Sequence, residues 1–237
     1  MNFFYRGNKL LSRLKGSSSF WVPPEGSWSL IYADDEFRPR LLLNAFEDSL
    51  KYQEYWKNLL QFRSTVSASL LINSPYEFAF KLDTQEEVQV FSQTELIEKY
   101  KSLGLILDTD YHGKPINSRF SSPYHQWQSR QRFIGGITDI DLVRIDIERE
   151  PIEIIEIKRS RIPINAWKPY FNDNGGYKIL EQFCFAEGLE FTIVYYHYDP
   201  RNQIENTEEL LILKKVGDFK FLKLGIFKLE DFIAKKY

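Results

Sequence analysis

Two neighbouring β-rich segments, about 133 to 147 and about 152 to 160, constrain the fold more than any other feature of the chain. Their sequences, FIGGITDIDLVRIDI and IEIIEIKRS, are rich in β-branched residues and flank a polar turn that contains a proline, a pattern that predicts a β-hairpin. A helical pattern follows at about 176 to 187, and the run EFTIVYYHY after it predicts a buried strand. Strand, strand, helix, strand in this order indicates an α/β fold whose sheet has mixed strand directions.

A loop of about 108 to 130, rich in Gly, Pro, Asn and Ser, is the expected internal boundary. It divides the chain into an N-terminal α+β region, residues 1–125, and a core, residues 126–237. The other expected elements are a short basic helix within 1–16, a strand at 27–35, a helix at about 40–62, a hairpin of 76–82 with 87–91, a helix at about 94–103 and a C-terminal hairpin.

Charge and cysteine content limit the classes of protein that fit this chain. The formal net charge is −2, so any surface that binds nucleic acid must be local, because the chain as a whole has no excess of basic residues. A single cysteine, Cys184, excludes an intramolecular disulfide and a cysteine-based zinc site. No apolar run is long enough for a signal peptide or a membrane span, so we expect a cytoplasmic protein with no membrane partner.

Three charged residues of the hairpin are expected on one face. With a four-residue turn, Asp141 would lie opposite Lys158, and Glu156 shares that face because it is two residues from Lys158. Their Cβ atoms would lie roughly 5 to 8 Å apart. Asp139 points to the same side but lies further along, opposite Ser160. A slip of one residue would move Asp141 to the other face, so the arrangement depends on the register.

The charge pattern alone leaves two interpretations open. The strand around Glu156 and Lys158 is otherwise rich in isoleucine, and buried charges are costly unless they are paired or bind a metal ion. Lys158 could simply form an ion pair with Asp141 or Glu156 in a half-exposed strand, and the pattern alone favours this structural interpretation. The other interpretation is a metal site.

The segment GITDIDLVRIDIEREPIEIIEIKRS resembles the PD-(D/E)XK nuclease superfamily, the fold shared by many restriction enzymes and Holliday-junction resolvases. Asp141 matches the acid of the first motif strand, and Glu156-Ile157-Lys158 matches the E-x-K triplet of the next. The literal PD pair is absent, since Ile140 precedes the acid. The resemblance covers about 130 to 198 and implies a restriction endonuclease-like core with a mixed central β-sheet flanked by helices.

The resemblance also implies a chemistry, the hydrolysis of phosphodiester bonds in DNA with Mg²⁺, for which Mn²⁺ would substitute. Asp141, Glu156 and the backbone carbonyl of Ile157 would bind the metal ion, a hard cation that prefers oxygen ligands. Lys158 would orient the attacking water or neutralise charge on the phosphate. Further candidates are accessory residues Asp139 and Gln182 and, as an upstream acid that completes the site, Glu47, Glu54, Glu95 or Glu98.

Cations near the motif indicate where nucleic acid would bind. Arg159, Arg161 and Lys168 follow the triplet, and Arg132 approaches from the other strand. Such residues are suited to contacts with a phosphate backbone. The expected partner is DNA, with a homodimer as the arrangement that would cut both strands. Two alternatives remain: an RNA-cleaving member, because a metal site does not distinguish the sugars, and a non-catalytic nucleic-acid-binding or interaction module with the same fold.

Overall fold

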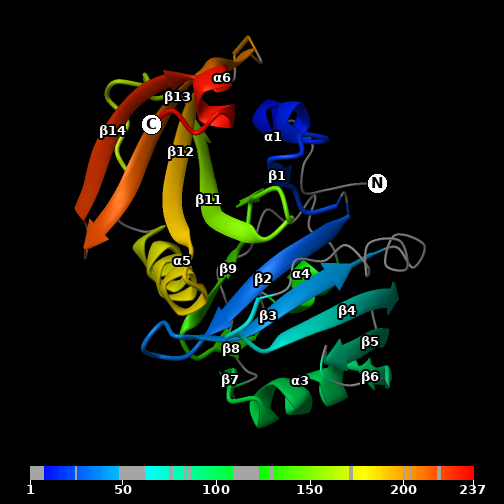
Figure 1. Cartoon of the computed structure of the whole chain (residues 1–237). Helices are drawn as coiled ribbons and strands as arrows, with labels where there is room; N and C mark the ends of the chain where they lie inside the picture. The colour runs from blue at the N-terminus through cyan, green and yellow to red at the C-terminus, as the bar shows by residue number, and fades with distance from the viewer. Residues whose placement is uncertain are drawn as a thin grey trace. The chain divides into compact units, whose positions relative to one another are not determined.

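The computed structural model describes residues 8–24, 26–47, 62–74, 77–82, 84, 87–108, 123–128, 131–170, 173–199, 201–202, 204–217 and 220–237. They form a mixed α/β protein in which strands predominate (Figure 1). The chain divides into two compact units, one built mainly from Pro23–Asp139 and the other from Gly7–Val22 and Ile140–Tyr237. Each unit contains a six-stranded sheet with mixed strand directions, so the coarse expectation of an α/β fold is confirmed.

The sheet of the first unit has the strand order β6-β5-β4-β3-β2-β9. Its strands are β2 (Ser27–Ala33), β3 (Pro39–Phe46), β4 (Ser67–Ser74), β5 (Glu77–Leu82), β6 (Gln89–Ser92) and β9 (Gly136–Asp139). β3 and β4 pair in parallel, and the other neighbours pair in antiparallel fashion. A separate two-stranded ladder joins β7 (Ile106–Asp108) and β8 (Arg132–Phe133).

Two helices, α3 (Gln93–Ser102) and α4 (Pro123–Gln128), contribute to the core of this unit. Ser92 caps α3 and forms a capping box with Glu95, and Gly104 follows the helix with a φ of +70°. The helix expected at about 94–103 is therefore confirmed. The expected hairpin before it is confirmed as β5 and β6.

The helix expected at about 40–62 is wrong in its first part, where the structure has strand β3. Every residue from Leu41 to Phe46 is buried, because β3 lies between β2 and β4 in the interior of the sheet. A continuous apolar run is compatible with an interior strand as well as with a buried helix, so periodicity could not separate the two. Residues 48–61, including the candidate acid Glu54, lie outside the described part of the chain.

The sheet of the second unit has the strand order β1-β10-β11-β12-β13-β14. Its strands are β1 (Phe20–Trp21), β10 (Leu142–Ile145), β11 (Pro151–Ser160), β12 (Glu190–Asp199), β13 (Ile204–Gly217) and β14 (Lys220–Lys228). β11 and β12 pair in parallel, and helix α5 (Asn174–Glu187) connects them along the chain. The other neighbouring strands are antiparallel. The expected hairpin, helix, buried strand and C-terminal hairpin are confirmed in this order.

Helices lie on both faces of this second sheet (Figure 1). α5 packs on the face that carries Lys158, whose ammonium group lies over the ring of Tyr177 in that helix. α1 (Lys9–Leu14) and α6 (Leu229–Ile233) lie on the opposite face, where Tyr196 binds Asn8 and Arg144 binds main-chain carbonyls of α6. No helix within the described ranges combines the length and the apolar character needed to cross a bilayer.

The strand expected at about 133–147 is divided into three pieces. Phe133 ends β8, Gly136–Asp139 forms β9 in the sheet of the first unit, and Leu142 begins β10 in the sheet of the second. The boundary between the compact units therefore lies after Asp139 rather than near residue 125, and residues 7–22 join the C-terminal unit.

A close approach between two backbone segments explains why β8 does not continue directly into β9. The N–H of Gly135 binds the carbonyl of Ala33 at 3.2 Å. A Cβ atom at position 135 would overlap the backbone of Asp34, and Gly136 has a φ of +117°. The two glycines thus bend the chain onto β2, which fixes β9 as the edge strand of the first sheet.

Candidate functional site

Asp141 lies where the chain passes from one sheet to the other, immediately before β10. Its side chain is half-buried, and Oδ2 accepts a hydrogen bond from the backbone N–H of Ile157 at 2.7 Å. The carboxylate thus takes the place that a backbone carbonyl would have if the β10–β11 ladder continued. Because the N–H and C=O of one strand residue point to the same side, the carbonyl of Ile157 is also directed toward this end of β10.

The register of the β10–β11 hairpin differs by two residues from the expected one. Leu142 pairs with Ile155, and the pairing is irregular between Arg144 and Ile145. The physical reason is that the turn begins earlier than expected. The N–H of Asp146 already binds the carbonyl of Glu150, and this bond closes the turn between the two strands.

This difference changes the neighbours of the candidate residues but not their face. Continuing the ladder by one pair places Asp141 beside Glu156 instead of Lys158. A shift of two residues keeps every side chain on its own face of the strand. Glu156 and Lys158 therefore share the α5 face of β11, and Asp141, which lies just before β10, adjoins them through its hydrogen bond to the N–H of the intervening Ile157.

Lys158 forms ion pairs with two acids on the α5 face of β11. Its Nζ lies 2.8 Å from Oε1 of Glu156 and 3.1 Å from Oδ2 of Asp173, and the three side chains are 26%, 8% and 34% exposed, respectively. The ring of Tyr177 lies 5.5 Å from the same Nζ, and its hydroxyl donates a hydrogen bond to Asp173 at 3.3 Å. The ion pair between Lys158 and Glu156, which the structural interpretation of the charge pattern expected, is thus present. The second ion pair, with Asp173, connects β11 to the start of α5.

The surroundings of Lys158 stabilise its protonated form. Burial is the largest single influence and lowers the pKa of Lys158, but attraction to Glu156, Tyr177 and Asp173 together outweighs it, so the pKa is raised above the usual range. Burial also raises the pKa of the Tyr177 phenol, against the opposing effect of the ammonium group. At neutral pH Lys158 is therefore a cation with three N–H donors, two of which face carboxylates.

The sequence analysis missed Asp173 and Tyr177. Helix α5 begins at Asn174, before the expected start, and Asp173 is its N-cap residue. The Asp173 side chain makes no cap hydrogen bond to the helix, and it binds Lys158 instead. A usable signal existed, because a helix that connects two parallel strands begins near the carboxyl end of the first strand, where the E-x-K triplet lies.

The expected accessory residues have other positions. Asp139 pairs with Leu30 in the sheet of the first unit, and Gln182 is exposed on α5, as in the alternative of a solvated helix face. Three of the upstream acids are in the first unit: Glu95 completes the capping box of α3, Glu98 binds Lys101 at 2.8 Å, and Glu47 follows β3.

The expected phosphate-binding cations are also spread out. Arg159 lies on the opposite face of β11 from Lys158, where it binds Glu205 at 2.5 Å. Arg161 and Lys168 are exposed in the segment that follows β11. Arg132 belongs to β8 of the first unit, and its side chain lies outside the described part of the structure.

The oxygen atoms near Asp141 are chemically suited to a hard cation. Mg²⁺ usually binds through one or two carboxylates together with water, and Asp141, Glu156 and the carbonyl of Ile157 supply such donors. Within the described ranges, no three His, Cys, Asp or Glu side chains are gathered as a metal cluster. The donor set therefore fits a magnesium site of few protein ligands and does not fit a closed zinc centre.

Comparison of the chain with protein-family models, with curated proteins and with solved structures found no match. The resemblance to the PD-(D/E)XK nucleases thus depends on the motif residues and on the order of elements around them. The geometry of these residues is the basis on which a function can be proposed.

Proposed function

We propose that the C-terminal unit is a metal-dependent nuclease of the PD-(D/E)XK type, which hydrolyses phosphodiester bonds in DNA. The observation that carries this proposal is that Glu156 and Lys158 form an ion pair on one face of β11, while Asp141 is bonded to the main chain of the intervening Ile157. The order β10, β11, α5, β12 supports it as well, because a restriction endonuclease-like core has strand, strand, helix and strand in this order.

In this proposal Asp141, Glu156 and the carbonyl of Ile157 would hold Mg²⁺ or Mn²⁺. The bound ion would supply Lewis-acid stabilisation of the negative charge that develops on the scissile phosphate. Asp141 has a fixed orientation because its carboxylate accepts the Ile157 N–H. Glu156 is largely removed from water, where the attraction between a carboxylate and a cation is stronger than in bulk solvent.

Lys158 would act through its charge. Since its pKa is raised, it is protonated at neutral pH and is not a general base. Two of its N–H groups face Glu156 and Asp173, which leaves the third as a donor to a phosphate oxygen or to the attacking water. A fixed cation at this point would stabilise the pentavalent phosphate more than the starting diester.

A non-catalytic nucleic-acid-binding module is the second candidate. The observation that favours it is the ion pairing of Lys158 with both Glu156 and Asp173, which gives the charge pattern a structural explanation. The two candidates differ in one respect: a nuclease loses its activity when the charge of Lys158 is removed, whereas a binding module has no such activity to lose.

A cleavage assay on the full chain separates them. Supercoiled plasmid, branched DNA and single-stranded RNA would each be incubated with the protein in Mg²⁺, in Mn²⁺ and in EDTA. We expect metal-dependent cleavage of DNA that falls by at least about 100-fold in Lys158→Met and in Glu156→Gln. Faster cleavage of RNA than of DNA would instead assign the RNA-cleaving alternative.

The matched control is Lys214→Met. Lys214 is also a strand lysine of the second sheet, it is 37% exposed, and it binds Glu190 at 3.1 Å, but it lies away from the candidate residues on β13. This variant should cleave as the unmodified protein does. Equal cleavage by the Lys158 variant and the unmodified protein, or no cleavage of any substrate with either metal, would overturn the proposed nuclease.

A further inference from the structure

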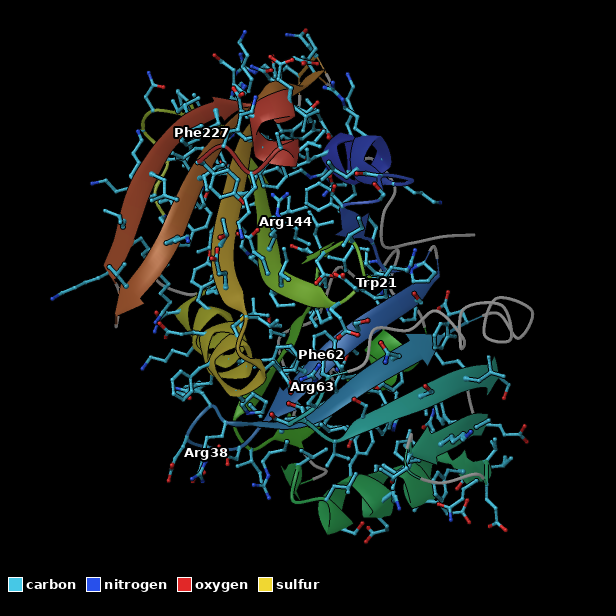
Figure 2. The ribbon with its side chains drawn as sticks, in the orientation of Figure 1. Trp21, Arg38, Phe62, Arg63, Arg144 and Phe227 are labelled. Carbon is cyan, nitrogen blue, oxygen red and sulfur yellow. The ribbon has the colours of Figure 1, made fainter. Side chains whose placement is uncertain are left out.

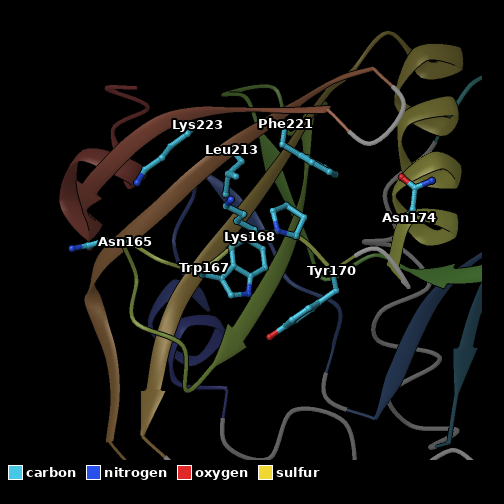
Figure 3. A pocket seen from close by; sticks show the side chains of 9 residues that line it. Asn165, Trp167, Lys168, Tyr170, Asn174, Leu213, Phe221 and Lys223 are labelled. Atoms are coloured by element: carbon cyan, nitrogen blue, oxygen red, sulfur yellow. The ribbon is translucent and has the colours of Figure 1, made fainter.

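A pocket lies beside the candidate site, on the same face of the second sheet (Figure 3). Its volume is about 420 Å³, within the range of pockets that hold small ligands. Four parts of the second unit line it: the segment after β11, the first turn of α5, strand β13 and strand β14. The lining residues with planar or polar side chains are Asn165, Trp167, Lys168, Tyr170, Asn174, Phe221 and Lys223.

Aromatic rings form much of the wall and are held in place by neighbouring rings. Trp167 stacks on Tyr195 of β12 with ring centroids 4.4 Å apart and an interplanar angle of 5°. Tyr170 meets Trp167 edge to face at 6.1 Å and is itself 43% exposed. An exposed ring held against a buried one offers a flat apolar surface with little freedom to lose, which suits stacking with a planar ligand.

The polar groups of the pocket indicate an anionic ligand with hydrogen-bonding edges. Lys168 and Lys223 are exposed, and neither forms an ion pair with any residue in the described ranges. Trp167 Nε1 and Asn174 Oδ1 are buried and have no hydrogen-bond partner in the described structure, a situation that is uncommon for buried polar groups. Two exposed lysines beside aromatic rings match a phosphate attached to a base.

The pocket is joined to the candidate site by the first turn of α5. Asp173, which binds Lys158, is followed directly by Asn174, which lines the pocket. Tyr177 contacts both regions, since Lys158 Nζ lies 5.5 Å from its ring and Phe221 packs edge to face against it at 5.6 Å. A group bound in the pocket would therefore be a near neighbour of a group bound at Lys158.

We propose that this pocket binds an unpaired nucleobase, stacked on Tyr170, while Lys168 and Lys223 contact the phosphates on either side of it. This inference rests on the proposed function in one respect, that the nucleotide in the pocket adjoins the phosphate that is cut. The substrate class is then nucleic acid with an unpaired nucleotide at the cut site, such as a single strand, a flap or a branch point. A fully paired duplex cannot place a base in the pocket without first extruding it.

The test is a binding measurement in EDTA, which does not require cleavage. The probes are a fluorescein-labelled oligothymidylate and a blunt DNA hairpin with the same label, titrated with the full chain and followed by fluorescence anisotropy. We expect Tyr170→Ala to weaken binding of the oligothymidylate by about tenfold and to change binding of the hairpin much less. Replacing Lys168 or Lys223 by Ala should make the slope of log affinity against log salt concentration less negative by about 0.7 for each lysine.

Two variants serve as controls. Tyr170→Phe keeps the ring and should bind like the unmodified protein. Phe185→Ala removes an 85% exposed aromatic ring on α5 that does not line the pocket, and it should also bind like the unmodified protein. An oligothymidylate affinity that is unchanged in Tyr170→Ala, or an equal loss for the oligothymidylate and the hairpin, would overturn the proposal.

The outcome is separable from that of the nuclease assay. A protein that cleaves DNA but binds oligothymidylate independently of Tyr170 would overturn the base pocket alone. A protein that shows the Tyr170 effect but cleaves nothing would support the base pocket and overturn the nuclease.

Discussion

Strand β11 carries a buried acid on each of its faces, and the two acids have different surroundings. On the face of α6, Glu153 pairs with Arg144 at 2.8 Å, and the two side chains are 0% and 3% exposed, respectively. On the face of α5, Glu156 pairs with Lys158 at the same distance, but the lysine is 26% exposed. The same strand thus contains one charged pair that is closed to solvent and one that is open to it.

The closed pair has its hydrogen bonds satisfied within the protein. Arg144, labelled in Figure 2, also donates to the main-chain carbonyls of Phe232 and Ile233 and to the hydroxyl of Tyr237, and it lies over the ring of Phe20 at 4.5 Å. The carboxylate of Glu153 accepts further hydrogen bonds from hydroxyl groups. Such a network fixes the packing of α6 on the sheet, and both charged side chains are closed to solvent.

The open pair differs in what it leaves available. Lys158 has a third N–H group, its partner Asp173 directly precedes the pocket residue Asn174, and Asp141 is bonded to the main chain of Ile157, between Glu156 and Lys158. The comparison indicates that burial of a charge pair is not by itself a sign of function. Access to solvent and adjoining space for a ligand separate the functional candidate from the structural pair.

The largest stability effect is expected at the closed pair. Replacing Arg144 by Leu leaves the Glu153 carboxylate buried without its cation, and we expect the free energy of unfolding to fall by about 3–5 kcal/mol. Urea denaturation of the variant and the unmodified protein would measure this. The double variant Arg144→Leu/Glu153→Leu should regain part of the loss, since both charges are removed. A loss in the single variant below about 1 kcal/mol, the value of a surface pair, would contradict the comparison.

A smaller effect is expected at the open pair. Lys158→Met keeps the apolar stem of the side chain and removes the charge. Glu156, which is 8% exposed, loses its cation but keeps some contact with water, and Asp173 is exposed enough to be solvated instead. We expect the free energy of unfolding to fall by about 1–2 kcal/mol, while cleavage of DNA is lost. Urea denaturation and the plasmid assay would measure the two effects on one sample. If Lys158→Met lost as much stability as Arg144→Leu, the Glu156–Lys158 pair would serve mainly to stabilise the fold, as the Glu153–Arg144 pair does.

The stability difference between Lys158→Met and the unmodified protein should narrow at alkaline pH. The pKa of Lys158 in the folded state is raised above its ordinary value of 10.5. Its contribution to stability is therefore complete below about pH 10 and declines as the pH rises toward the folded-state pKa. Urea denaturation of both proteins between neutral pH and about pH 11 would measure the change. A constant difference would mean that the ammonium charge does not stabilise the fold.

The smallest effect is expected for Lys214→Met, in which both partners of the ion pair are accessible to water. Lys214 and Glu190 are 37% and 46% exposed. We expect a change in the free energy of unfolding of about 0–1 kcal/mol, from the same urea experiment. A loss greater than that of Lys158→Met would invalidate the ranking by exposure.

Much of the second unit could be predicted from the sequence, because its elements have strong local patterns. The isoleucine-rich β11, the helix that ends at Gly188 and the β-branched and aromatic β12 were each found with bounds within a few residues. The chain crossing at 140–141 could not be predicted in this way. Apolar residues continue through it, so the pattern does not show that β9 and β10 belong to different sheets.

The candidate site could be predicted only in part. The face shared by Glu156 and Lys158 follows from the two-residue period of a strand, whereas the position of Asp141 before β10, bonded to the Ile157 N–H, does not. The second acid, Asp173, depends on where α5 begins, which is set by the loop before it and not by a periodic pattern. The pocket could not be predicted at all, because its lining residues come from four separate elements of the chain.

Diffraction from crystals soaked in Mn²⁺ tests the central claim most directly. Anomalous scattering would locate the metal without reference to activity. We predict a manganese peak between the carboxylates of Asp141 and Glu156, close to the carbonyl of Ile157, and its loss in crystals of Glu156→Gln. The absence of a peak there, at a Mn²⁺ concentration that saturates known magnesium-dependent nucleases, would contradict the proposal that this part of the hairpin is a metal site.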